Sequence, residues 1–134
     1  MATRNPAIES IERSPFTRIL GISIVSAANG EATARMPFDA KLLNDGGLDV
    51  PVHGGAIASL ADVAACAAIW TLAVTQRSAT ISMTVNYAGP AIRSDLVAHA
   101  IVRRAGKRVA SIAVEIRDTS DALVADALVT YKIA

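Results

Sequence analysis

The sequence has few aromatic residues, a single cysteine and almost no net charge. Aromatic side chains make up 4% of its 134 residues, and the formal net charge is +1 at pH 7. A chain so close to neutral lacks the basic excess that binding to nucleic-acid phosphates requires. The single cysteine, Cys66, excludes an intramolecular disulfide and a zinc site built from several cysteines. We expect no metal site, and the cysteine usage and an N-terminus unlike a secretion signal predict a cytoplasmic protein.

Small apolar residues are present in excess. Hydrophobic side chains account for 52% of the chain, against 19% charged, and most are Ala, Val and Ile. Such a chain has ample surface to bury, and its length predicts one compact domain over residues 1–134. The run Gly54–Thr75 carries one charge, Asp62, and is long enough to span a bilayer. It is mostly Ala, Gly, Ser and Thr, and a central Asp costs about 2.5–3.5 kcal/mol on insertion. We therefore expect a buried helix and no membrane contact.

Apolar spacing in the first part of the chain predicts a helix, a hairpin and a long loop. Residues Pro6–Leu20 have helical spacing that Pro15 interrupts. Two alternating runs, Gly21–Ser26 and Glu31–Met36, flank an Asn-Gly pair and predict a β-hairpin. The turn-rich stretch Phe38–His53 predicts a loop, and an ordered loop of that length tends to be functional.

The second part of the chain predicts one apolar helix followed by four strands. The helix is expected from about Gly55 to Val74. In the first strand, one face is expected to carry Ile81, Met83 and Val85, and the other Thr80, Ser82, Thr84 and Asn86. This order of elements predicts an α+β fold with an antiparallel sheet around the helix, and a second copy of the chain to cover the remaining helix surface. The four strands are expected at Ala79–Tyr87, Leu96–Arg104, Arg108–Arg117 and Leu123–Lys132.

The start of the long helix gathers the residues best suited to chemistry. Gly54 and Gly55 leave the first amides of the helix approachable, and those amides together with the helix dipole suit a developing oxyanion. The same glycines also fit an ordinary tight helix start. Asp62 is a lone charge in an apolar helix, which favours a functional group over a structural one. His53 is suited either to orienting a carbonyl or to satisfying nearby backbone groups.

Two further segments have both a functional and a structural interpretation. Asn44 is able to hydrogen-bond a carbonyl, but Asn before Asp-Gly-Gly is also ordinary turn chemistry. Residues 103–108 include four cations at a predicted hairpin tip, which suits either a grip on phosphates or a solvated turn. Cys66 has no activating base visible in the sequence, and we interpret it as a buried thiol.

Together these residues resemble the hotdog-fold acyl-CoA thioesterases of the PaaI-like family. The resemblance covers nearly the whole chain. It implies a hotdog fold, in which a curved antiparallel sheet wraps around one central helix, and hydrolysis of an acyl-CoA thioester without a cofactor, coenzyme A being part of the substrate. The motifs that carry it are Leu20-Gly21-Ile22, His53-Gly54-Gly55, Ser59-Leu60-Ala61-Asp62, Tyr87-Ala88-Gly89-Pro90 and Arg104-Ala105-Gly106-Lys107.

The resemblance also implies a role for individual residues. It makes Asp62 the catalytic carboxylate, and assigns polarisation of the thioester carbonyl to the amide of Gly54 or Gly55. His53, Asn44 and Thr80 complete the implied catalytic set, Thr80 by helping to place water. The residues expected to grip coenzyme A are Arg104, Gly106, Lys107, Arg108, Asn86 and Tyr87.

The resemblance further implies that the site is shared between subunits. Asp62 would face the helix start of its neighbour in a homodimer, and two dimers would pair into a homotetramer. One departure concerns Asn44: eight residues separate it from His53, more than the family usually has. This puts the role of Asn44 in question, with Asp45 or Asp49 as substitutes.

Two other functions are compatible with the same residues. A hotdog hydratase or dehydratase acting on enoyl thioesters would use His53 and Asp62 as an acid–base pair. A non-catalytic acyl-CoA binding module is the third possibility, but a pure binder gains nothing from the carboxylate of Asp62. For hydrolysis, the sequence leaves open whether Asp62 acts as a general base or as a nucleophile.

Overall fold

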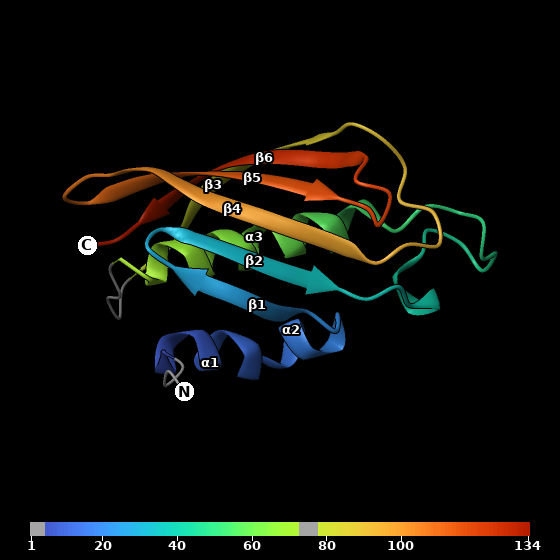
Figure 1. Ribbon diagram of the computed structural model, residues 1–134, viewed down its shortest axis with the longest axis horizontal. Coiled ribbons are helices and arrows are strands. Elements are labelled where there is room, and N and C mark those ends of the chain that lie inside the picture. Colours follow the sequence, from blue (N-terminus) through green and yellow to red (C-terminus); the bar gives the residue numbers. More distant parts are fainter. Residues whose placement is uncertain (1–4, 73–77) are drawn as a thin grey trace.

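The fold is a single curved antiparallel sheet with a long helix packed against it. The computed structural model describes residues 5–72 and 78–134 (Figure 1). The sheet has the strand order β1-β2-β4-β5-β6-β3. The expected α+β hotdog architecture is thereby confirmed. The elements are α1 (Pro6–Arg13), α2 (Pro15–Ile19), β1 (Ser23–Ala28), β2 (Glu31–Met36), the 3-10 turn η1 (Ala40–Leu42), α3 (Gly54–Trp70), β3 (Ala79–Tyr87), β4 (Leu96–Ala105), β5 (Val109–Arg117) and β6 (Leu123–Lys132).

The N-terminal helices and the first hairpin form where the sequence predicts them. Asn5 caps α1 by accepting a hydrogen bond from the Ala7 amide, and the chain breaks between α1 and α2 before Pro15. In the β1–β2 turn, Asn29 and Gly30 have φ angles of 54° and 80°. Two consecutive left-handed residues are what a tight hairpin turn requires, and Asn-Gly supplies them at little cost.

Helix α3 lies against the sheet through small residues. Its fully buried alanines let the backbone of the helix approach the strands closely. The helix begins one residue earlier than predicted and ends at Trp70, while Val74, the predicted end, lies outside the described residues. Among residues 5–72 and 78–134, no helix is long and apolar enough to cross a membrane. The buried residues of α3 are Ala56, Ile57, Leu60, Ala61, Ala64, Ala65, Ala67, Ala68 and Ile69.

Strand β3 departs from the simple alternation that its sequence predicts. The register with β6 shifts between Thr80 and Ser82, so Ile81 occupies a β-bulge and is 58% exposed. The expectation that Ile81 shares a face with Met83 and Val85 is therefore wrong. A bulge re-aims the residue beside it, and Thr80 here turns towards α3 instead of away from it.

The two edges of the sheet differ in how they are protected. At the β1 edge, the Glu12 carboxylate of α1 accepts a hydrogen bond from the Ile24 amide at 2.8 Å. At the opposite edge, β3 is nine residues long, carries no charged residue, and among the described strands pairs only with β6. A long uncharged edge is unusual in a protein that remains a monomer.

Candidate active site

The first turn of α3 presents one amide that is occupied and one that is not. His53 is the N-cap, and its Nδ1 accepts a hydrogen bond from the Gly55 N–H at 2.8 Å. The Gly54 N–H has no acceptor among the described residues, and its carbonyl accepts a hydrogen bond from the Tyr87 hydroxyl at 2.8 Å. Of the two amides suggested by the sequence, only that of Gly54 is available to a ligand in this conformation.

Both positions need glycine because of close neighbours. A Cβ on Gly54 would lie 3.2 Å from the Tyr87 ring, and a Cβ on Gly55 would lie 3.0 Å from His53 Nδ1. These separations are shorter than ordinary carbon contacts. The glycine pair therefore lets an aromatic ring and a histidine pack directly onto the helix start.

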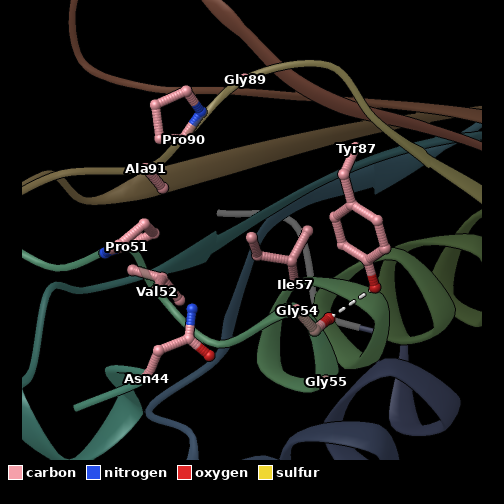
Figure 2. Close-up of a pocket in the computed structure, with 10 residues that line it drawn as sticks. All are labelled: Asn44, Pro51, Val52, Gly54, Gly55, Ile57, Tyr87, Gly89, Pro90 and Ala91. Carbon is pink, nitrogen blue, oxygen red and sulfur yellow. Dashed lines mark hydrogen bonds between the residues drawn. The ribbon is translucent and has the colours of Figure 1, made fainter.

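A pocket of about 520 Å³ opens beside this turn. Figure 2 shows Asn44 and Gly54 on one side of it, with Pro90 and Ala91 across from them. Most of the lining is apolar, which suits the organic part of a ligand, while Asn44 and the free amide supply polar contacts. The residues that line it are Asn44, Pro51, Val52, Gly54, Gly55, Ile57, Tyr87, Gly89, Pro90 and Ala91.

The longer loop before His53 leaves Asn44 beside the helix start. Leu43 forms a β-bridge with Val52, and the Asn44 amide donates to the Pro51 carbonyl at 3.1 Å. Residues 45–50 therefore protrude as a closed loop whose two ends remain together. The extra residues put the role of Asn44 in question on sequence grounds, but the structure brings Asn44 into the same pocket as Gly54.

Asp62 lies two turns further along α3 and is held by Thr80. The Thr80 hydroxyl donates to Asp62 Oδ1 at 2.6 Å, a contact that depends on the bulge at Ile81. Asp62 is half-buried on the stripe of α3 that the sheet leaves uncovered. At 1.5 Å of rise per residue, about 12 Å of helix axis separates it from Gly54. The two groups are thus too far apart to act on one carbon atom within a single chain.

A partly buried polar cluster lies further along the same helix. The Trp70 indole donates to the Tyr131 hydroxyl at 2.9 Å, and Cys66 Sγ lies 3.4 Å from the same oxygen. Burial raises the pKa of Cys66 to about 11 and that of Tyr131 to about 12. Both groups are therefore neutral at physiological pH. Cys66 is half-buried, less enclosed than the sequence predicted, and its raised pKa disfavours a role as a nucleophile.

The residues expected to grip coenzyme A fall in three separate places. Arg104, Gly106, Lys107 and Arg108 lie at or beside the exposed β4–β5 turn, and among the described residues no carboxylate lies within 4.0 Å of their cationic groups. Tyr87 is at the opposite end of β3, next to Gly54. Asn86 is exposed opposite Asp126, one position away from Tyr87 and so on the other face of the sheet. Within one chain, the structure does not bring these groups together.

Sequence reasoning missed several residues of the pocket. Val52, Ile57 and Ala91 line it, and Tyr87 was expected to contact coenzyme A, not to bind the Gly54 carbonyl. The glycine pair was the available signal, since two glycines at a helix start imply a bulky neighbour. No group of three or more His, Cys, Asp or Glu suited to a metal ion is found within residues 5–72 and 78–134.

Comparison with known proteins assigns the family. Residues 52–125 match the family model of the thioesterase superfamily. A Halobacterium salinarum protein with the provisional name of an esterase is 38% identical over 109 residues, which cover 77% of this chain and 72% of that protein. The PaaI protein of the Escherichia coli phenylacetic acid degradation operon is 27% identical, with a TM-score of 0.84 over 94% of this chain and 88% of its own. Zebrafish thioesterase superfamily member 2 is 26% identical, with a TM-score of 0.80 over 96% of this chain and 94% of its own. The chain belongs to the thioesterase superfamily and has the hotdog fold of its PaaI-like members.

Proposed function

We propose that the protein hydrolyses acyl-CoA thioesters to a carboxylic acid and free coenzyme A. The observation that carries this proposal is that α3 holds both reactive groups. The free amide of Gly54 lies at an apolar pocket, and the carboxylate of Asp62 accepts a hydrogen bond from Thr80 of β3. These are the two groups that thioester hydrolysis needs, an oxyanion donor and a group that activates or replaces water. Coenzyme A enters as part of the substrate, and the proposed chemistry uses no cofactor.

The Gly54 amide is the proposed oxyanion donor. It lies at the positive end of the α3 dipole, and its direction is fixed because the His53 carbonyl, which belongs to the same planar peptide group, accepts hydrogen bonds from the Ala56 and Ile57 amides at 3.0 and 3.2 Å. One such donor lowers the barrier by about 3 kcal/mol in acyl transfer. The Asn44 side chain, in the same pocket, is suited to donate a second hydrogen bond to the thioester oxygen.

Asp62 is the proposed catalytic carboxylate, with Thr80 as the residue that positions it. As a general base, Asp62 takes a proton from water while the water oxygen bonds to the thioester carbon. As a nucleophile, its own oxygen forms that bond, and water hydrolyses the resulting anhydride. In both routes the carbon–sulfur bond breaks and coenzyme A leaves as a thiolate that then takes up a proton.

We infer that a complete site needs two subunits. The Tyr87 hydrogen bond to the Gly54 carbonyl ties the helix start to one end of β3, and the Thr80–Asp62 hydrogen bond ties the carboxylate to the other end. Antiparallel pairing of β3 with the same strand of a second copy, centred on Thr84 when the bulged Ile81 is left out of the count, sets Thr80 opposite the partner's Tyr87. That pairing would bring Asp62 close to the start of α3 in the partner. One bound thioester would then contact Asp62 of one subunit and the Gly54 amide of the other.

The same arrangement gives the basic turn a role. β5 begins level with Lys132 and Ala79, so the turn lies at the Asp62 end of β3. Arg104, Lys107 and Arg108 are then placed to bind the phosphates of coenzyme A at the composite site. Pairing of two dimers into a homotetramer remains a prediction.

The hydratase alternative requires His53 and Asp62 to act as a pair. Within one chain each is engaged separately, His53 with the Gly55 amide and Asp62 with Thr80. Product analysis with saturated and unsaturated acyl-CoA substrates separates the two reactions, since only hydrolysis releases free thiol.

The decisive variant is Asp62→Asn. It keeps the shape of the side chain but removes the charge, and we expect kcat to fall roughly 10²–10⁴-fold, as for loss of an acid–base group. Release of free thiol is measured across short, medium, long and aryl acyl-CoAs. Asp126→Asn is the matched control, because Asp126 lies beside Asn86 on the other sheet face. Wild-type turnover in Asp62→Asn would sink the assignment.

A single-turnover reaction in ¹⁸O-labelled water tests the nucleophilic role of Asp62. General-base catalysis places the label in the product acid during the first turnover. Nucleophilic catalysis in which water attacks the Asp62 carbonyl of the anhydride gives an unlabelled acid oxygen in that turnover and leaves the label in Asp62, where mass spectrometry of the peptide detects it.

A further inference from the structure

The protruding loop at residues 45–50 begins and ends on the pocket. Asn44, just before it, and Pro51, just after it, both line the pocket. The opposite wall is formed by Pro90 and Ala91, which precede Arg93 in the connection between β3 and β4. A displacement of the loop that reaches its ends therefore changes the position of one pocket wall relative to the other.

An ion pair connects the tip of this loop to the opposite wall. Arg93 Nε donates to Asp49 Oδ1 at 2.7 Å, and the amide of Val52 donates to the carbonyl of Ala91 at 3.0 Å, both residues lining the pocket. The Asp49 side chain is 83% exposed. Within the described part of the chain, no other ion pair or side-chain hydrogen bond joins the loop to that segment.

The Arg93 side of the ion pair is rigid. Ala91 is fully buried, and the buried Ser94 hydroxyl contacts Thr119 and accepts a hydrogen bond from the Thr119 amide at 3.0 Å. Arg93 itself has a φ angle of 46°, a left-handed conformation that is unfavourable for residues with a Cβ and persists only where the surroundings hold it. Because the backbone at Arg93 is fixed and the loop is exposed, the ion pair positions the loop relative to Arg93.

We propose that the Asp49–Arg93 ion pair holds loop 45–50 against the Pro90–Ala91 wall and so limits the size of the acyl group that the pocket accepts. The inference rests on the proposed thioesterase function, with the apolar pocket receiving the acyl group. Asp49 and Arg93 are specificity-determining residues in this view and take no part in the chemical step.

The test compares chain-length profiles of Asp49→Asn and Arg93→Gly with that of the wild type. Glycine suits the left-handed φ of Arg93, so the substitution removes the side chain without adding strain. We measure kcat/KM for a series of straight-chain acyl-CoAs and take the ratio of long to short substrates. Coenzyme A is common to the series, so the ratio reports only the acyl part. An exposed ion pair contributes up to about 1 kcal/mol, so the ratio is expected to rise roughly two- to fivefold in both variants.

Two controls make the result specific to this ion pair. Arg13→Gln breaks the exposed Glu9–Arg13 pair on α1 and leaves the ratio unchanged. The exchanged double variant, Asp49→Arg with Arg93→Asp, returns the ratio towards that of the wild type. An unchanged ratio in both single variants, or an equal loss of kcat/KM for every substrate, overturns the proposal. A wild-type protein that hydrolyses no acyl-CoA overturns the proposed function, and this inference with it.

Discussion

At the residue scale, Gly54 joins three requirements at one backbone position. Its amide is free, its carbonyl is held by Tyr87, and its missing side chain makes room for the Tyr87 ring. The direction of the amide is set by the preceding residue, because the N–H shares its planar peptide group with the His53 carbonyl, which accepts hydrogen bonds from the Ala56 and Ile57 amides. A change at this position therefore acts on geometry more than on stability.

The substitution Gly54→Ala tests that geometry. The new Cβ forces the Tyr87 ring or the helix start to move by a few tenths of an ångström. We expect kcat/KM to fall about tenfold, since small misplacements at a reacting group have large effects on rate. The melting temperature should change little, because the preference of alanine over glycine for helix, up to about 1 kcal/mol, offsets the cost of the contact with Tyr87. Gly46→Ala is the matched control, since a Cβ there meets nothing within 4 Å. Wild-type kcat/KM in Gly54→Ala would remove Gly54 from the site.

At the element scale, α3 is joined to β6 by a polar cluster inside an otherwise apolar contact. Cys66 and Trp70 of the helix meet Tyr131 of the strand. Burial raises the pKa of Cys66 from 9.0 to about 11 and that of Tyr131 from 10.0 to about 12. In this range the unfolded chain loses its protons first, so the folded protein binds more protons and its stability falls as pH rises.

The free energy of unfolding should therefore decline between pH 9 and about pH 12, starting at the unfolded pKa of Cys66. Urea unfolding at several pH values measures the decline. In Cys66→Ala, the free energy of unfolding should fall less steeply with pH in the lower part of this range, because one of the two titrating groups is gone. This holds whatever the stability of the variant at neutral pH. Parallel curves for the variant and the wild type would show that the thiol ionises equally in both states.

The same scale shows what the sequence could predict. Hydrophobic periodicity and the Asn29-Gly30 turn located the helices and strands, with ends correct to within a few residues where the structure describes them. The sequence did not predict the bulge at Ile81, because a bulge depends on the register with a neighbouring strand and leaves no local signature in the sequence. The sequence predicted the loop that contains residues 45–50 but not its closure, which depends on a bridge between Leu43 and Val52. Both failures adjoin the candidate site, which needs irregular backbone to aim Thr80 and Asn44.

At the scale of the whole molecule, one folded chain buries only part of the excess of apolar residues in the sequence. The outer stripe of α3, which includes Val63, Cys66 and Trp70, is half-buried, and Ile81 and Tyr87 of β3 are exposed. The β1 edge is covered by α1, but the β3 edge is open and uncharged. An open edge beside an apolar stripe favours pairing with a second copy, which also unites the two halves of the proposed site.

Complementation between two inactive variants tests this assembly directly. If each site combines Asp62 of one subunit with Gly54 of the other, a mixed dimer of Asp62→Asn and Gly54→Leu has one site with both residues intact. Purified through two different affinity tags, this dimer should show about half of the wild-type activity, while each parent variant is inactive. If each site lay within one chain, every site in the mixed dimer would carry one substitution and no activity would return. A mixed dimer as inactive as its parents would therefore contradict the shared site. It would mean that Asp62 and Gly54 of one subunit act together although about 12 Å of helix axis separates them.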